Sequence, residues 1–269
     1  MKNIKIVAFP SVCVDVFDGT DIVRPGGEEL NFSSHAAEIE GVSVILLGAI
    51  SDDYYGQCIK KAVEQTKIDF SRIRTERDLP TATCKTYMTP EKDRYYKEDS
   101  WNGAIIDRFR INDSEMQLLA EADVVYTHIR SKCFEQTVEL KKKLGFKLAV
   151  DFEIRRDFDK MEEYAPYIEY FMISGTEELL PYFETFSRKY DGLFNMTLGE
   201  HGSVTYSHGK CYRVSACKVD EIVDTTGCGD SYHAGFICEH MMHKDILRAM
   251  NRGSEMAAAN LSHYGGFIR

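Results

Sequence analysis

VDTTGCGDSYHAGF, residues 223–236, is the stretch of sequence that decides the fold. A strand-like approach at residues 221–223 leads into a glycine turn, and residues 230–242 follow with a pattern that predicts a helix. Gly227 and Gly229 allow the backbone to turn so that successive N–H groups point the same way. Such amides at the start of a helix form an anion site with the positive end of the helix dipole behind it. The stretch therefore predicts a phosphate site on a strand–turn–helix unit.

Asp230 lies in the first turn of that helix, next to the predicted phosphate. Phosphoryl transfer needs an aimed hydroxyl, a group that takes its proton, and donors that neutralise charge on the phosphate oxygens. Asp230 is the candidate base, and the turn Gly227, Cys228 and Gly229 is the candidate anion hole. The plain alternative is a helix-capping aspartate beside turn glycines, which is a common structural pattern.

Two other nucleotide-binding motifs do not fit the sequence. A G-x-G-x-x-G dinucleotide fingerprint would need a third glycine at position 232, which is Tyr232, and it belongs in a first βαβ unit. A nucleotide-dependent oxidoreductase is therefore disfavoured. The chain contains no G-x-x-x-x-G-K-[ST] sequence, so a Walker-type loop does not hold the phosphates.

Strand and helix patterns alternate along most of the chain. Short apolar, β-branched runs predict buried strands at 4–9, 42–47, 123–127, 147–151, 170–173 and 193–197. Helical patterns are found at 31–40, after a cap at Ser51 or Asp52, and at 114–122, 134–143, 177–189, 230–242 and 245–261. This alternation indicates a parallel sheet covered by helices on both faces, in one domain spanning 1–269.

Two polar, strand-like segments interrupt the alternation. Residues 81–100 predict a hairpin that turns at 90–93, and residues 13–25 predict an extended piece; both are too polar to be buried on both faces. We expect them to form a small sheet projecting from the main domain. Free strand edges on that sheet could pair two subunits into a homodimer.

Composition excludes several classes of protein. A formal net charge of −10 argues against a nucleic-acid binder. The eight cysteines contain no C-x-x-C pair, so neither zinc spacing nor a disulfide framework is indicated. No apolar run approaches the ~20 residues of a membrane-spanning helix. These features predict a cytoplasmic protein with small-molecule partners.

The 224–230 stretch resembles the C-terminal signature of the ribokinase-like (PfkB) carbohydrate kinase family, with Cys228 where alanine is usual. GGEELN at 26–31 and GAISDDYYG at 48–56 resemble the family's two N-terminal elements, and TLGEHG at 197–202 resembles its nucleotide loop. The resemblance runs from about residue 15 to the C-terminus, in the family's order. It implies a three-layer α/β/α sandwich with a mainly parallel sheet and a small β lid formed by segments 13–25 and 81–100.

The same resemblance implies an ATP-dependent sugar kinase and assigns roles to individual residues. Asp230 would be the base. The sugar would be bound by Asp15, Gly26, Gly27 and Asn31, and ATP by Thr197, Gly199, Gly202 and Asn260. Magnesium would accompany the phosphates near Glu177, and a monovalent cation such as K⁺ would lie near Asp224. The lid would close over the sugar and exclude water.

Some positions depart from the family pattern. Ser174 replaces the asparagine of an N-x-x-E element that involves magnesium, and the D-x-N-x-R element is reduced to DFEIR at 151–155. Ser174 and the residues around 93–96 look similar to bacterial fructoselysine 6-kinases, whose substrate carries an amine; Glu28, Glu29, Glu98 and Asp99 could meet such a cation. Kinases of ribose, fructose or 2-keto-3-deoxygluconate remain alternatives, as does a non-catalytic homologue that binds a sugar or nucleotide.

Overall fold

The computed structural model describes residues 3–88, 94–95 and 97–267 of the chain. A central sheet has the strand order β15-β14-β13-β12-β11-β10-β1-β4. The pairs from β4 to β13 are parallel. The sheet continues with two antiparallel pairs, β13 with β14 and β14 with β15. The mainly parallel sheet predicted from the alternation of elements is confirmed.

The elements have the following bounds. The strands are β1 (Ile4–Ala8), β2 (Cys13–Phe17), β3 (Val23–Gly26), β4 (Val42–Leu46), β5 (Gly48–Ser51), β6 (Ile73–Glu76), β7 (Thr83–Met88), β8 (Arg94–Tyr95), β9 (Trp101–Asn102), β10 (Val124–His128), β11 (Lys147–Asp151), β12 (Tyr170–Ser174), β13 (Leu193–Thr197), β14 (Ser203–Ser207) and β15 (Lys210–Val214). The helices are α1 (Glu28–Ala37), α2 (Tyr54–Val63), α3 (Ala104–Asp107), α4 (Asp113–Glu121), α5 (Phe134–Leu144), α6 (Phe158–Tyr164), α7 (Leu180–Lys189), α8 (Cys228–His243) and α9 (Ile246–Asn260), with short 3-10 turns η1 (Ala165–Tyr167), η2 (Glu177–Leu179) and η3 (Gly199–His201).

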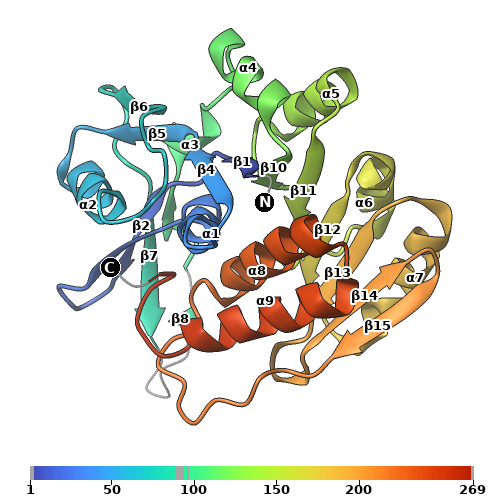
Figure 1. Cartoon of the computed structure of the whole chain (residues 1–269). Helices are drawn as coiled ribbons and strands as arrows, with labels where there is room; N and C mark the ends of the chain where they lie inside the picture. The colour runs from blue at the N-terminus through green and yellow to red at the C-terminus, as the bar shows by residue number, and fades with distance from the viewer. Residues whose placement is uncertain (1–2, 89–93, 96, 268–269) are drawn as a thin grey trace.

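Helices cover the sheet on both faces, which gives the molecule three layers (Figure 1). Apolar residues of α1, α8 and α9 pack on one face, and those of α5, α6 and α7 pack on the other. Helices α8 and α9 lie side by side (Figure 1). Because the strands from β4 to β13 are parallel, their carboxyl ends meet at one edge of the sheet, where ligands bind in open α/β folds.

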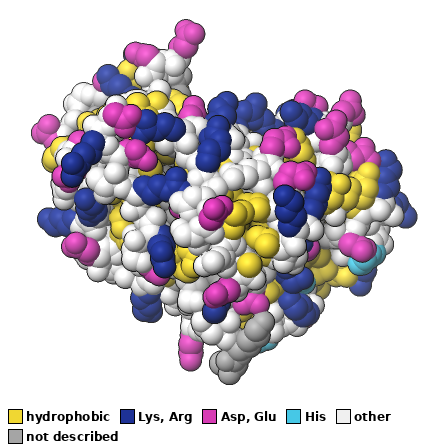
Figure 2. All heavy atoms as spheres, turned by 90° about the horizontal axis from the view of Figure 1, so that it is seen from above, with side chains coloured by type: hydrophobic (Ala, Val, Ile, Leu, Met, Phe, Trp, Pro, Cys, Tyr) yellow, Lys and Arg dark blue, Asp and Glu magenta, His cyan; other side chains and the backbone are white. Residues whose placement is uncertain are grey.

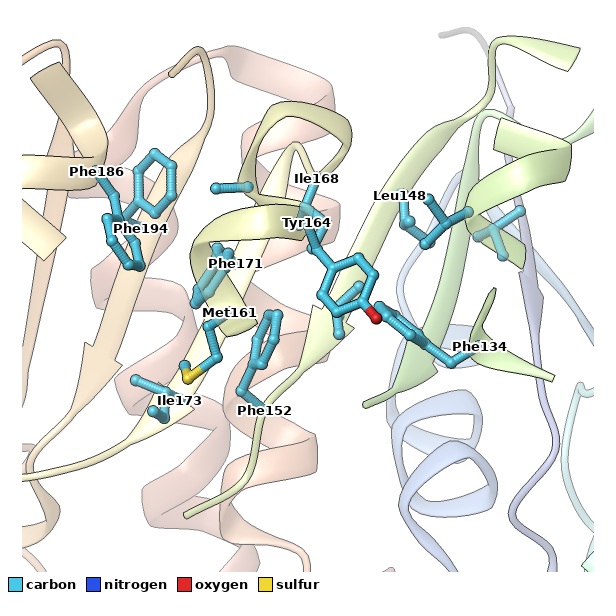
Figure 3. Packing of buried hydrophobic residues seen from close by; sticks show 14 of the residues in the cluster. Phe134, Leu148, Phe152, Met161, Tyr164, Ile168, Phe171, Ile173, Phe186 and Phe194 are labelled. Carbon is cyan, nitrogen blue, oxygen red and sulfur yellow. The ribbon is translucent and has the colours of Figure 1, made fainter. Parts of the chain in front are cut away.

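An aromatic cluster anchors the face that α5, α6 and α7 cover (Figure 3). Phe171 of β12 is fully buried, and its ring stacks on Phe152 with the ring centres 3.9 Å apart. Phe183 and Phe194 each approach Phe171 to 5.3 Å between ring centres. Aromatic pairs at such separations stabilise a core beyond the area that they bury. This cluster holds β11, β12 and β13 together and thereby fixes where those strands end.

The two polar segments do form a small second sheet. Its strand order is β3-β2-β7-β8, with β9 also paired to β7. The turn predicted at 90–93 lies outside the described residues. Asp53 ties this sheet to α2, since its carboxylate accepts hydrogen bonds from the Thr81 amide at 2.8 Å and the Gly56 amide at 2.8 Å. We refer to this sheet, β2, β3, β7, β8 and β9, as the lid sheet.

Several predicted boundaries were wrong. Helix α2 is capped by Asp53, not by Ser51 or Asp52. Helix α1 begins at Glu28, three residues before the predicted start, because Gly27 adopts a φ of 107° that ends the preceding strand. Residues 221–223 form no strand; the Val223 amide donates instead to the Leu261 carbonyl. Residues 203–214 form an antiparallel hairpin, which the sequence pattern had not indicated.

The surface carries both signs of charge. On the face drawn in Figure 2, Lys and Arg side chains are interspersed with Asp and Glu. Among the helices of the described residues, none has both the length and the apolar character needed to cross a bilayer.

Candidate active site

The predicted anion turn sits at the amino end of α8. Gly227 is the N-cap, with a left-handed φ of 74°, and the first intrahelical bond runs from the Ser231 amide to the Gly227 carbonyl at 2.8 Å. The amides of Gly229 and Asp230 precede that bond and therefore have no carbonyl to bind within the helix. The Cys228 amide differs, because it donates to the Thr225 carbonyl at 3.3 Å. The first turn of α8 thus offers the amides of Gly229 and Asp230 to an anion.

The turn is braced from behind by buried side chains. The Asp224 carboxylate accepts from the Thr226 amide at 2.9 Å and from the Gly265 amide at 2.9 Å. Asn260 is 1% exposed, and its side-chain amide donates to the Thr226 carbonyl at 2.6 Å. These bonds hold the glycine turn at residues 227–229 in one conformation. Contact of Asn260 with adenine, and of Asp224 with a monovalent cation, stay predictions.

The candidate base lies against the candidate sugar-binding residues. Asp230 is 7% exposed, and its Oδ2 accepts a 2.9 Å hydrogen bond from Nδ2 of Asn31. A Cβ added to Gly26 would lie 2.9 Å from Oδ2 of Asp15 and 3.7 Å from Oδ1 of Asn31. Asp15, Gly26, Asn31 and Asp230, scattered over 215 residues of sequence, are therefore brought to one place. Gly27 stands beside them, where a Cβ would collide with the Ser11 carbonyl oxygen at 2.7 Å.

The surroundings of Asp230 raise its affinity for a proton. Burial raises the pKa of Asp230 well above its usual range, and the negative charges of Glu28 and Asp151 raise it further. The hydrogen bond from Asn31 acts in the opposite direction, because it stabilises the charged carboxylate. A raised proton affinity suits a group that must take a proton from a hydroxyl.

A second charged cluster stands beside the amino end of α1. Glu29 is fully buried and accepts hydrogen bonds from the Ser11 amide at 3.0 Å and from His128 Nδ1 at 2.8 Å. Glu28 contacts both His128 at 3.1 Å and Arg130 at 3.2 Å. Burial opposes a charge on His128, but Glu29 and Glu28 outweigh it and raise its pKa to about 10. Glu29 was expected to be able to meet a cationic amine of the substrate; in the structure its carboxylate is buried and already paired with His128.

The predicted nucleotide residues follow β12 and β13 at the same edge of the sheet. Thr197 ends β13, and its hydroxyl lies 3.1 Å from that of Ser174, which ends β12. Gly199 begins the 3-10 turn η3 after Thr197, and Gly202 directly follows that turn; both have a positive φ. Asp151, which lies near Asp230, ends β11. Because β13 is two strands away from β11 in the sheet, the turn η3 lies at the same edge as Asp151, two strands further along.

Two groups of residues gather atoms of the kind that bind metals. They are Glu28, Glu29 and His128, and Asp151, Asp230 and His233; within each group the atoms lie within 4.8 Å of one another. The first group is occupied by its own ion pairs, so we assign no metal to it. Glu177, the predicted magnesium residue, forms a two-fold ion pair with Arg213 at 2.6 and 2.8 Å. Its role near magnesium stays a prediction.

Part of this site was not predicted from the sequence. Asp151 and His233 are both buried beside Asp230. His233 follows Asp230 by three residues, a spacing that puts both on one side of a helix, but no local spacing linked either of them to Asp151. The C-terminal Gly266 was not predicted either; a Cβ there would lie 2.2 Å from Oδ1 of Asn31, so the position has room for glycine alone. The pair Gly265-Gly266 was the one available sign of a close backbone approach.

Comparisons with known proteins found similar sequences and a similar fold. The family model described as "pfkB family carbohydrate kinase" matches residues 19–268. The chain is 24% identical to a fructoselysine 6-kinase of Shigella flexneri, over 95% of this chain and 96% of that one. It is 23% identical to a fructosamine kinase of Bacillus subtilis, over 98% of this chain and 93% of that one. The structure matches the ribokinase of Arabidopsis thaliana complexed with ribose and ATP, with a TM-score of 0.80, 17% identity and coverage of 98% and 94% of the two chains.

Proposed function

Because the chain belongs to the pfkB family of carbohydrate kinases, we propose that it transfers the γ-phosphoryl group of ATP to a hydroxyl of a fructosamine, a ketose sugar whose first carbon carries an amine-linked group. The observation that carries the kinase assignment is the buried Asp230 at the amino end of α8, held by Asn31. The acceptor class rests on similarity to fructosamine-phosphorylating relatives along almost the whole chain.

The proposed step uses the groups at the start of α8. A carboxylate oxygen of Asp230 takes the proton of the sugar hydroxyl while the oxygen of that hydroxyl attacks the γ-phosphorus. A new oxygen–phosphorus bond forms, the bond to the β,γ-bridging oxygen breaks, and ADP leaves with its electron pair. The amides of Gly229 and Asp230, with the helix dipole behind them, face the charge on the transferred group. Magnesium enters with ATP as part of the nucleotide substrate.

Binding of the sugar falls to the residues around Gly26. Asp15 and Asn31 supply a carboxylate and an amide for neighbouring hydroxyls, and the absence of side chains at Gly26 and Gly27 lets the backbone pass close to Asp15 and Ser11. ATP would lie over Thr197, Gly199 and Gly202, next to Asn260. The lid sheet would close over the sugar and keep water from the γ-phosphate.

Assembly through the lid sheet is a further part of the proposal. Tyr95 and Trp101 are 43% and 48% exposed on strands β8 and β9. A lid–lid dimer would bury these rings, and a Tyr95→Glu, Trp101→Glu variant should then elute as a monomer where the unchanged protein elutes as a dimer. Elution of both proteins as monomers would remove this part of the proposal.

An acceptor panel tests the proposal. The purified protein is incubated with MgATP and fructoselysine, fructose, ribose or 2-keto-3-deoxygluconate, and ADP and sugar phosphate are measured together. Fructoselysine should give the highest kcat/KM. Preference for another sugar would overturn the acceptor class alone, whereas ligand-induced stabilisation without turnover on any sugar would favour a non-catalytic binding protein.

A further inference from the structure

A second buried carboxylate stands beside the proposed base. Asp151, the last residue of β11, is 7% exposed, and one of its carboxylate oxygens lies within 4.8 Å of both Asp230 and His233. His233 follows Asp230 by three residues on α8, so that both side chains leave the helix on the same side. The reaction described above gives Asp151 and His233 no role.

Each member of this group is held in place by neighbours. Oδ1 of Asp151 accepts a hydrogen bond from the Glu153 amide at 2.7 Å, and its Oδ2 lies 3.7 Å from Nδ1 of His233. That nitrogen is 2.9 Å from the hydroxyl of Tyr126, whose ring stacks on Phe32. Nε2 of His233 is buried and has no partner within the described residues. A polar group left unpaired in a core costs free energy.

The charges in this group do not cancel. Burial lowers the pKa of His233 to about 3, so the imidazole is neutral and supplies no positive charge to the carboxylates. Burial and the nearby Glu153 raise the pKa of Asp151 to about 7. Two buried carboxylates this close bind the first proton more tightly than either would alone.

Other charged and titratable groups face Asp151 as well. They are Glu28 and Glu29 of α1, Tyr126 and His128 of β10, Glu153 of its own loop with the ion-pair partner Arg130, and Asp230 and His233 of α8. The positive members, His128 and Arg130, are each already paired with glutamates. The electrostatic field at Asp151 and Asp230 is therefore set mainly by the negative charges of the two carboxylates themselves.

We propose that Asp151 is a positioning residue for phosphoryl transfer, which forms with Asp230 a carboxylate pair that takes up the single proton released by the sugar hydroxyl. The negative charge of Asp151 strengthens Asp230 as a base. The neutral His233, fixed by Tyr126, fills the space beside the pair without adding a positive charge that would weaken it. This inference rests on the proposed role of Asp230.

The test is the pH dependence of kcat/KM in an Asp151→Asn variant. Asparagine keeps the size of the side chain and removes its charge, so Asp230 should lose its proton at lower pH. The fall of kcat/KM on the acid side should move down by about one pH unit or more, and the plateau at high pH should also fall because Asp230 becomes a weaker base. The protonation of ATP contributes equally to every variant and cancels in the comparison.

Asp157→Asn is the matched control. Asp157 stands in the same loop, and its side chain caps α6 by accepting from the Lys160 amide at 3.2 Å; its removal should leave the pH profile in place. Should Asp151→Asn fail to fold, Asp151→Ser removes the same charge from a smaller side chain and should shift the profile in the same direction. A uniform loss of rate with no shift would overturn the inference. If Asp230→Asn retained turnover, the base itself would be misassigned, which is a separate outcome.

Discussion

Nδ2 of Asn31 donates a 2.9 Å hydrogen bond to Oδ2 of Asp230, although the two residues are 199 positions apart in the chain. The bond joins α1, which follows the lid sheet, to α8, which carries the anion turn. It fixes the orientation of the Asp230 carboxylate relative to the residues of the proposed sugar site. It also opposes the effect of burial, because an N–H donor favours the charged carboxylate that can accept a proton.

Removal of this donor should slow the reaction. A hydrogen bond to a charged group is worth about 1.5–3 kcal/mol, so we expect Asn31→Ala to lower kcat/KM for the sugar roughly 10- to 100-fold. The KM for ATP should change little, because Asn31 belongs to the proposed sugar site and not to the proposed ATP site. Steady-state kinetics with each substrate varied in turn measure both effects. An equal loss for both substrates would mean that Asn31 supports the fold of the whole site instead.

The contact between Gly26 and Asp15 should decide affinity for the sugar. A methyl group at Gly26 would lie 2.9 Å from Oδ2 of Asp15 and push that carboxylate aside. We expect Gly26→Ala and Asp15→Asn to raise the sugar KM by similar factors, about tenfold or more, with the ATP KM unchanged. If Asp15→Asn left the sugar KM unaltered, Asp15 would not contact the sugar.

The buried ion pair of His128 predicts how stability depends on pH. The folded protein holds His128 with a pKa raised to about 10 by Glu29 and Glu28 against the effect of burial, while an unfolded histidine titrates near 6.5. Its contribution to stability is therefore complete below about pH 6.5 and is lost as pH rises toward 10. In urea unfolding at a series of pH values, His128→Gln should show a smaller decline of the free energy of unfolding over that range. Equal slopes for both proteins would contradict the pairing.

The aromatic cluster of Figure 3 predicts a cost in stability. Phe171 is fully buried and contacts Phe152, Phe183 and Phe194. Phe171→Ala should lower the free energy of unfolding by about 3–5 kcal/mol, and Phe171→Leu should cost less because it leaves a smaller cavity. Urea titrations measure both. Its ring faces α7, away from α8, so the fraction that remains folded should keep its kcat.

The sequence predicted those elements whose own residues decide their structure. Buried apolar runs such as 147–151 and 193–197 became β11 and β13 with the predicted bounds, because a parallel strand covered on both faces needs continuous apolar residues. The conformation of the glycine turn at residues 227–229 was likewise decided by its own residues. By contrast, residues 203–214 carry polar side chains, and their pairing as β14 and β15 depends on the neighbouring β13.

The site could be predicted only in part for the same reason. Family resemblance named Asp230 and Asn31, but their contact arises from the packing of α1 against α8, which no local pattern encodes. Asp151 begins the DFEIR element and His233 follows Asp230 by three residues, but the proximity of Asp151 to the other two depends on where β11 ends relative to α8. Glu29 was considered as a contact for a cationic amine, because nothing in its neighbourhood indicated that His128, 99 residues later, would pair with it.

The central claim is that Asp230 takes the proton of the sugar hydroxyl, and Asp230→Asn tests it most directly. Asparagine preserves the shape of the side chain but cannot accept the proton. With saturating MgATP and the best acceptor, we predict that kcat falls by at least about 10²-fold, while calorimetry shows ATP binding close to that of the unchanged protein. Near-normal turnover in a folded Asp230→Asn protein would contradict the account.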